Sequence, residues 1–245
     1  LAEGETVLEN CACEPEIQWL CRYMRSMGAK IQGDGTSEIR IQGVKSLSAG
    51  CIQVPPDRIV SGTYICAAAI TRSQIVLENP PEGELKAFLE VYRKMGGQYK
   101  GNSGKLLVNG KNVQSPVKLL ETGVYPGFPT DMQSVFSAML TTAKGTSIIV
   151  ENIFENRFKY TQELNKMGAK ITVEGKSAII RGVRKIYGAN VKATDLRGGA
   201  ALVLAGLSAK GITKVENIEY ILRGYENFDK KLRNINANIQ MINDQ

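Results

Sequence analysis

The chain repeats itself, and this feature constrains its fold more than any other. The dipeptide Glu-Asn closes a short apolar run four times, and the successive glutamates lie 69, 73 and 65 residues apart. The copies are Glu9-Asn10, Glu78-Asn79, Glu151-Asn152 and Glu216-Asn217. A second landmark keeps the same register, because a Met-Gly pair follows three of the copies and a weaker Ile-Asn-Ala-Asn sequence follows the fourth. Two landmarks in one register predict a fold built from duplicated segments.

Each repeat begins with a predicted helix. In the first repeat, apolar side chains recur from Ile17 to Met27 at the i, i+3, i+4, i+7 spacing, with a proline near the start and a glycine just past the end. Two short strand-like runs follow at 30–32 and 38–44, joined by a Gly-Asp-Gly-Thr turn. One repeat is too small to cover its own apolar faces. We therefore expect an α/β (α+β) fold in which repeated β-α-β-β-α segments share one core.

A second helix is expected in three repeats, opening at Asp57, Asp131 and Asp195. Aspartate is a common N-cap because its carboxylate accepts hydrogen bonds from the first turn of a helix. This predicts a capping role for Asp57 and Asp195. Asp131 differs, because Tyr-Pro-Gly-Phe-Pro-Thr directly precedes it and fixes the approach of the chain. A rigid loop that delivers one carboxylate to a helix start is typical of a binding site.

Function is expected where one repeat departs from the others. Arg157 lies six residues after Glu151, and Arg223 lies seven after Glu216, where the first two repeats carry glutamates. In a first helical turn an arginine is unfavourable by about 0.3–1 kcal/mol. Two interpretations stay open at this point. The arginines bind a phosphate or carboxylate at the helix start, or they lie in solvent or pair with a neighbouring acid.

Composition limits the kinds of catalytic and metal site that the chain can form. The sequence contains no histidine, which excludes Ser-His-Asp and Cys-His catalysis and histidine metal sites within it. Five cysteines without Cys-x-x-Cys spacing indicate reduced thiols in a cytoplasmic protein. We expect no metal and no cofactor.

Charge and hydropathy limit the classes of binding partner. The net charge of +7 suits small anions, and because Lys and Arg are spread out without interleaved aromatics we expect no nucleic-acid partner. No window approaches the roughly 18 to 20 consecutive apolar residues of a membrane span, so no membrane partner is expected.

The repeat also indicates a missing segment. Ala-Lys-Gly sequences at 143–145 and 209–211 precede a Glu-Asn pair, and Ala-Glu-Gly at 2–4 has the same offset from the first pair. The first residues therefore look like the last turn of a helix whose body is absent. We expect the chain to be the C-terminal portion of a longer polypeptide, with the missing N-terminal half as a partner.

Four blocks carry a resemblance to a known family. They are Pro-Gly-Phe-Pro-Thr-Asp-Met-Gln at 126–133, Glu-Asn-Ile-Phe-Glu-Asn-Arg-Phe at 151–158, Ala-Thr-Asp-Leu-Arg at 193–197 and Arg-Gly-Tyr-Glu at 223–226. With them the chain resembles the bacterial UDP-N-acetylglucosamine 1-carboxyvinyltransferases along its whole length. The resemblance implies an inside-out α/β barrel of enolpyruvyl transferase type, with two domains of three β-α-β-α-β-β units each and ligands in the cleft between them. It makes residues 1–55 the C-terminal part of the first domain and residues 56–245 the second domain.

The resemblance implies a transferase reaction. The enolpyruvyl group of phosphoenolpyruvate passes to the 3-hydroxyl of UDP-N-acetylglucosamine, phosphate is released, and this is the first committed step of peptidoglycan synthesis. Asp131 matches an aspartate that contacts the sugar and takes the hydroxyl proton, and Ile153 matches a backbone contact to the nucleotide sugar. Arg157 and Arg223 match arginines that hold phosphoenolpyruvate. Asp195 matches an aspartate next to the reaction centre, so Asp131, Asp195 and Arg223 are the implied catalytic residues.

The sequence departs from the family pattern in two places. The family's aspartate before the second arginine is Leu222 here, which leaves the orientation of Arg223 open. The family's reactive cysteine loop and its Lys-Asn pair have no counterpart in this sequence, so the chain alone is expected to be inactive.

Two other functions stay open for this sequence, and a third is disfavoured. A sibling transferase acting on shikimate 3-phosphate (5-enolpyruvylshikimate-3-phosphate synthase) and a non-catalytic paralogue that binds the nucleotide sugar stay open. A relative that processes RNA ends should show a catalytic histidine, and the sequence has none.

Overall fold

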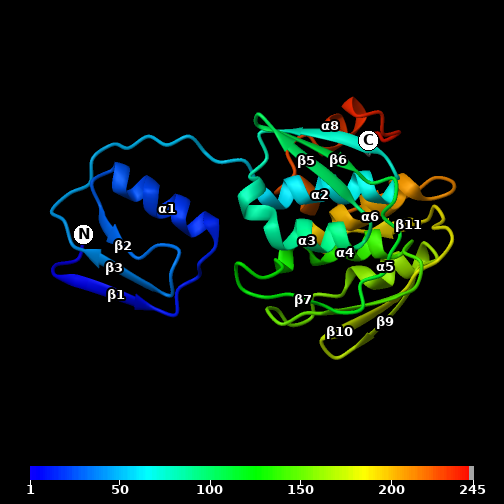
Figure 1. Ribbon diagram of the computed structural model, residues 1–245, viewed down its shortest axis with the longest axis horizontal. Coiled ribbons are helices and arrows are strands. Elements are labelled where there is room, and N and C mark those ends of the chain that lie inside the picture. Colours follow the sequence, from blue (N-terminus) through cyan, green and yellow to red (C-terminus); the bar gives the residue numbers. More distant parts are fainter. Residues whose placement is uncertain (243–245) are drawn as a thin grey trace. The chain divides into compact units, whose positions relative to one another are not determined.

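The computed structural model describes residues 1–242 and divides the chain into two compact units. The first unit comprises residues 1–56 together with 123–127, and the second comprises 57–122 and the chain from Phe128 onward. Figure 1 shows the elements of each unit. None of the helices in the described part of the chain is long and apolar enough to span a bilayer.

The first unit is a helix on a three-stranded sheet. Its elements are β1 (Glu5–Glu9), α1 (Pro15–Ser26), β2 (Lys30–Gln32) and β3 (Glu38–Gln42). Strand β3 lies between β1 and β2 and is antiparallel to both. The chain leaves α1 through Gly28 at a φ of +98°, a conformation that glycine adopts at little cost. A small core joins Cys21 of the helix to Ile31 and Ile39 of the sheet, as the periodicity predicted.

Within the described residues, the second unit contains two further copies of this helix-and-hairpin arrangement and ends with a strand and two helices. Its elements are α2 (Arg58–Ile70), β4 (Gln74–Glu78), η1 (Glu82–Leu85), α3 (Lys86–Lys94), β5 (Gln98–Asn102), β6 (Lys105–Asn109), β7 (Leu120–Glu121), η2 (Thr130–Met132), α4 (Gln133–Leu140), β8 (Thr146–Val150), α5 (Tyr160–Lys166), β9 (Lys170–Glu174), β10 (Ser177–Arg181), β11 (Asn190–Lys192), α6 (Leu196–Ser208), β12 (Lys214–Glu216), α7 (Glu219–Leu222) and α8 (Phe228–Asn234). The strands form a sheet in the order β4-β6-β5, a sheet in the order β7-β8-β10-β9 and a parallel pair of β11 and β12.

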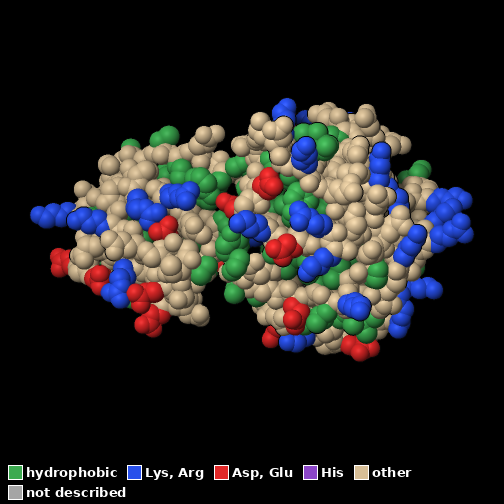
Figure 2. All heavy atoms as spheres, in the orientation of Figure 1, with side chains coloured by type: hydrophobic (Ala, Val, Ile, Leu, Met, Phe, Trp, Pro, Cys, Tyr) green, Lys and Arg blue, Asp and Glu red, His purple; other side chains and the backbone are tan. Residues whose placement is uncertain are grey.

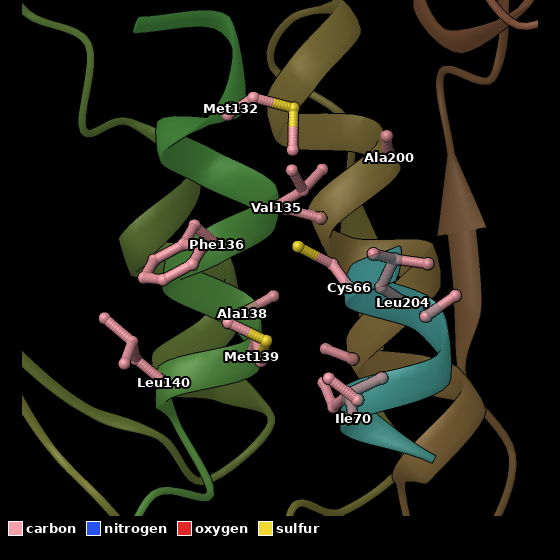
Figure 3. Packing of buried hydrophobic residues seen from close by; sticks show 14 of the residues in the cluster. Cys66, Ile70, Met132, Val135, Phe136, Ala138, Met139, Leu140, Ala200 and Leu204 are labelled. Carbon is pink, nitrogen blue, oxygen red and sulfur yellow. The ribbon is translucent and has the colours of Figure 1, made fainter. Parts of the chain in front are cut away.

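Helices α2, α4 and α6 contact one another and form the core of the second unit. Figure 3 shows side chains of the three helices meeting there, among them Cys66 of α2, Val135 of α4 and Leu204 of α6. Every residue of α4 is buried, so other elements enclose this helix on all sides. The sheets and shorter helices of the second unit lie outside this core, so its repeated segments share one apolar centre as expected. The first unit has a separate small core.

Two of the three core helices also share a polar position. Thr63 in α2 and Ser137 in α4 lie six residues after Asp57 and Asp131 respectively. Each hydroxyl is buried and contacts a tyrosine hydroxyl. Thr63 Oγ1 lies 2.9 Å from the hydroxyl of Tyr225, and Ser137 Oγ lies 2.7 Å from the hydroxyl of Tyr160. Hydrogen bonding satisfies these buried hydroxyls.

The Glu-Asn landmark marks the ends of strands. Asn10, Asn79 and Asn217 follow β1, β4 and β12 with φ values of 55°, 49° and 58°. Asparagine takes this left-handed conformation more readily than most residues. The third copy behaves differently, since Asn152 is not in this region and its main-chain N–H donates to the hydroxyl of Thr122 at 2.9 Å.

Candidate functional site

Three charged side chains meet beside the N-terminal ends of α4 and α6. Asp131 Oδ1 lies 2.5 Å from Arg157 Nη2, and Asp131 Oδ2 lies 3.4 Å from Arg197 Nη2. Their segments are η2, the turn before α5 and the first turn of α6. The side chain of Asp131 is 41% exposed, whereas those of Arg157 and Arg197 are 23% and 13% exposed. Two cations around one carboxylate leave the cluster with a net positive charge, which favours binding of an anion.

Buried partners hold Arg197 in place. Its Nη1 donates to the hydroxyl of Tyr225 at 3.2 Å, and that hydroxyl contacts Thr63 Oγ1. Burial raises the pKa of Tyr225, and the neighbouring Arg197 and Thr63 offset this only in part. Burial acts to lower the pKa of Arg197, but Tyr225 and Asp131 outweigh it and the net shift is upward. Tyr225 is therefore a neutral phenol beside a permanent cation at neutral pH.

One donor of Arg197 is left over. Its buried Nε has no hydrogen-bond partner within the described residues. A buried unpaired donor on a charged group is costly, so a ligand oxygen that reached it would be bound favourably.

Arg157 lies outside the helix in which it was expected. Helix α5 begins at Tyr160, so Arg157 belongs to the preceding turn, and the argument from a cation in a first helical turn was wrong for it. The guanidinium lies over the ring of Phe154, 5.0 Å from its centroid, and pairs with Asp131. Pairing with an acid was one of the two open interpretations, and the structure shows that pair.

Asp131 differs from the other two aspartates in what its side chain contacts. Asp57 Oδ1 accepts from the N–H groups of Ile59 and Val60 at 2.7 and 2.9 Å, so it caps α2 as predicted. Asp131 lies within the 3₁₀ turn η2 and caps neither this turn nor α4. Its carboxylate therefore stays available to the two arginines, and the expectation that α4 itself opens at Asp131 was wrong.

Asp195 is confirmed as the N-cap of α6. Its Oδ1 accepts from the N–H groups of Arg197 and Gly198 at 3.0 and 2.8 Å, and its Oδ2 accepts from the hydroxyl of Thr194 at 3.1 Å. These bonds engage both oxygens. A role for Asp195 next to a reaction centre stays a prediction.

Ile153 lies in the exposed segment that follows β8. Its N–H donates to Glu151 Oε1 at 2.9 Å, so a backbone contact from this residue to a ligand would come from its carbonyl. Glu151, which the sequence offered only as a landmark, is a buried carboxylate at the base of this segment.

Arg223 stands apart from the cluster. It lies at the C-terminal end of α7, where a cation is favourable, and not in a first turn as expected. Its side chain is exposed and makes no ion pair or side-chain hydrogen bond within residues 1–242. A ligand-binding role for Arg223 stays a prediction.

Sequence reasoning missed Arg197, although the signal was present. Helix α6 starts at Leu196, so Arg197 occupies a first helical turn, as Arg58 does in α2. The argument applied to Arg157 and Arg223 would have identified it, had the helix boundaries been known.

Other candidate sites in the described part of the chain are weak. No three His, Cys, Asp or Glu side chains within residues 1–242 gather as ligands of a metal ion would. An open surface cavity of about 520 Å³, lined by residues of η1, α3 and β5, contains none of the predicted site residues. In Figure 2 Lys and Arg side chains are dispersed over the face shown, with Asp and Glu between them. That face therefore presents no single basic stripe.

Comparison with known proteins places the chain in a family. Residues 1–232 match the family model described as EPSP synthase (3-phosphoshikimate 1-carboxyvinyltransferase). The chain therefore belongs to this family of carboxyvinyl transferases. It is 48% identical over 242 residues to UDP-N-acetylglucosamine 1-carboxyvinyltransferase 2 of Caldanaerobacter subterraneus, covering 99% of this chain and 58% of that protein.

Other curated relatives carry the same name. The chain is 48% identical over 246 residues to UDP-N-acetylglucosamine 1-carboxyvinyltransferase of Orientia tsutsugamushi, covering 100% of this chain and 58% of that protein. The chain thus spans just over half the length of the curated relatives it matches. These relatives confirm the resemblance seen in the four sequence blocks.

Solved structures confirm the α/β fold. The enolpyruvyl transferase NikO from Streptomyces tendae superposes with a TM-score of 0.86 at 25% identity, covering 98% of this chain and 57% of that one. An EPSP synthase from Acinetobacter baumannii superposes with a TM-score of 0.72 at 20% identity, covering 95% of this chain and 57% of that one.

Proposed function

We propose that this chain belongs to an enzyme that transfers the enolpyruvyl group of phosphoenolpyruvate to the 3-hydroxyl of UDP-N-acetylglucosamine and releases phosphate. The reaction would begin peptidoglycan synthesis for the cell wall. One observation carries the proposal: the Asp131, Arg157 and Arg197 cluster joins a carboxylate to two guanidinium groups with a net positive charge. The names of the curated relatives favour the nucleotide sugar as acceptor over shikimate 3-phosphate.

The two arginines suit the donor substrate. Phosphoenolpyruvate carries a carboxylate and a phosphate, and a planar guanidinium binds either group through two parallel hydrogen bonds. In this structure the carboxylate of Asp131 contacts both guanidinium groups. We propose that the donor's carboxylate takes over part of these contacts and reaches the unpaired Nε of Arg197. Arg223 is proposed to bind the same donor from its exposed position.

Asp131 is proposed to act on the acceptor hydroxyl. Its two carboxylate oxygens contact Arg157 and Arg197 in this structure. When the donor engages these arginines, an oxygen of Asp131 is free to accept the proton of the acceptor hydroxyl. The sugar oxygen then adds to C2 of phosphoenolpyruvate, its proton passes to Asp131, and C3 gains a proton. Loss of phosphate from C2 and of a proton from C3 restores the double bond.

Two site residues would contribute in other ways. The carbonyl of Ile153 is proposed to contact the nucleotide sugar, since its N–H is engaged by Glu151. Asp195 is proposed to lie next to the reaction centre, where it would act through Oδ2 because Oδ1 caps α6.

We further propose that residues 1–55 belong to a first domain and residues 56–245 to a second. The reactive cysteine that the resemblance implies would come from a segment outside this chain, so the chain alone is proposed to be inactive. A cytoplasmic location is proposed because all five cysteines are unpaired thiols, as expected in a reducing compartment.

The test is phosphate release from phosphoenolpyruvate by the full-length product of the gene that encodes this chain. Release only in the presence of UDP-N-acetylglucosamine would support the proposal. Phosphate release only in the presence of shikimate 3-phosphate would show that this compound, and not the nucleotide sugar, is the acceptor. No release with either acceptor, together with binding of the nucleotide sugar, would favour a non-catalytic paralogue.

A further inference from the structure

The third Glu-Asn landmark carries a buried carboxylate that the proposed reaction does not use. Glu151 is 3% exposed. Its Oε1 accepts from the hydroxyl of Thr122 at 2.9 Å and from the N–H groups of Ile153 and Phe154 at 2.9 and 3.1 Å. Its Oε2 accepts from the hydroxyl of Thr130 at 2.9 Å. An ionised carboxylate accepts about four hydrogen bonds, so the capacity of Glu151 is filled by uncharged donors.

The repeat does not require this burial. The equivalent residues Glu9 and Glu78 are exposed, and Glu216 is half-buried. The side chain of Glu78 is 78% exposed and pairs with Lys105 at 3.2 Å. A carboxylate that is buried loses its hydrogen bonds to water. Hydrogen bonds from protein donors must replace them. Within residues 1–242, only the third copy of this repeat position has such a set of donors.

The donors come from three segments that frame the candidate site. Thr130 directly precedes Asp131, and the N–H groups of Ile153 and Phe154 belong to the segment that leads to Arg157. Thr122 ties the second segment further, because its hydroxyl accepts from the N–H of Asn152 at 2.9 Å. One carboxylate thus fixes the base of the Asp131 turn against the base of the 152–154 segment.

We propose that Glu151 is a positioning residue for the acceptor side of the site. It holds Asp131 and the carbonyl of Ile153 at the spacing that a nucleotide sugar spans, so that the acceptor hydroxyl meets the carboxylate of Asp131. This inference rests on the proposed function. Glu151 has no hydrogen bond to Arg157 or Arg197, whose polar partners are Asp131 and Tyr225. Replacing Glu151 is therefore expected to change mainly the placement of the acceptor, and not the binding of the donor.

Three variants test the inference. Thr130→Val keeps the side-chain shape and removes only the donor to Oε2, which detaches the Asp131 turn. Glu151→Gln keeps the size but replaces the charged acceptor by a neutral amide. Glu78→Gln is the matched control, because it makes the same change at the same repeat position where the side chain is exposed.

Two measurements are made on each variant. The first is amide hydrogen exchange at Ile153 and Phe154. In Glu151→Gln we expect exchange to accelerate about tenfold, because a neutral acceptor binds an N–H more weakly than a carboxylate. In Thr130→Val the exchange of these two amides stays unchanged.

The second is steady-state kinetics of the full-length product. In both Thr130→Val and Glu151→Gln, kcat falls about tenfold to a hundredfold through misplacement of Asp131. The KM for phosphoenolpyruvate changes less than about twofold, since the donor's binding groups are intact. Glu78→Gln matches the unmodified protein in both measurements.

The outcomes separate the two proposals. If the unmodified protein turns over and Thr130→Val keeps its kcat, the positioning role is overturned. Unchanged exchange in Glu151→Gln overturns the claim that this carboxylate holds the segment. If the unmodified protein releases no phosphate, the proposed function fails, and the exchange measurement decides whether Glu151 joins the segments. If Glu151→Gln shows no cooperative transition in thermal unfolding, it is not folded, and the kinetic test is made with Thr130→Val.

Discussion

Replacing Tyr225 by phenylalanine tests the anion site directly. The substitution removes one buried hydroxyl, which accepts from Arg197 at 3.2 Å and contacts Thr63 at 2.9 Å. Thr63 keeps a partner, because its hydroxyl donates to the carbonyl of Ile59 at 2.8 Å. The main loss is a hydrogen bond to a charged group, worth about 1.5–3 kcal/mol. We expect the free energy of unfolding to fall by about that amount.

The same change should weaken anion binding. Arg197 loses the contact that fixes its guanidinium, while its ion pair with Asp131 remains. If about 1.4 kcal/mol of the lost energy is expressed in binding, the Kd for phosphoenolpyruvate rises about tenfold. The assay is calorimetric titration of the full-length product with phosphoenolpyruvate, alongside thermal unfolding.

Tyr160→Phe is the matched control. Tyr160 is a fully buried tyrosine whose hydroxyl contacts Ser137 at 2.7 Å and donates to Gln133 Oε1 at 3.0 Å. It has no hydrogen bond to an arginine in the described part of the chain. We expect a loss of stability of about 1 kcal/mol with unchanged Kd. Equal effects of the two substitutions on Kd, or an unchanged Kd in Tyr225→Phe, would show that Tyr225 does not hold Arg197 for ligand binding.

Three further predictions use other parts of the chain. Asp131→Asn should abolish phosphate release while thermal unfolding shows an intact fold; near-normal release by this variant would contradict the role of Asp131. Asp57→Ala and Asp195→Ala should each cost about 0.5–2 kcal/mol of stability as lost N-caps, and only the second should also lower kcat; equal kcat values would exclude a role for Asp195 in the reaction. The hydrogen bond from Arg25 lowers the pKa of Asp34, so its contribution is present above the unfolded pKa of about 3.9 and is lost as pH falls through the lower folded value. Acid unfolding of the first unit, followed by fluorescence of the single tryptophan, should therefore begin at higher pH in Arg25→Gln than in the unmodified protein, and coincident curves would contradict this.

Local signals explain what the sequence predicted well. The helices and hairpins of the repeats follow from apolar periodicity and turn residues, which act over a few positions. Asp57 and Asp195 were identified as caps because the donors they bind lie two and three residues ahead. The four sequence blocks led to the family because they hold their order along the chain.

Tertiary placement explains what the sequence left open. The contact between Arg197 and Asp131 joins residues 66 positions apart, and no local pattern encodes that distance. The burial of Glu151 is equally non-local, since its hydroxyl donors Thr122 and Thr130 come from other segments. The expectations for Arg157 and Arg223 failed at helix boundaries, which sequence patterns define least well.

The three core helices show how a repeated fold acquires one site. Each is preceded by an aspartate, and an aspartate at a helix start ordinarily caps it, as Asp57 and Asp195 do. In the second repeat the turn Thr130–Met132 is closed by its own backbone bond from Met132 N–H to the carbonyl of Pro129 at 3.0 Å. The hydroxyl of Thr130 is held by Glu151. Because backbone and neighbour now secure this helix start, the carboxylate of Asp131 is released from capping and faces two arginines. The Glu-Asn pair that departs from the others, Glu151-Asn152, therefore belongs to the repeat that follows the one whose aspartate is available for chemistry.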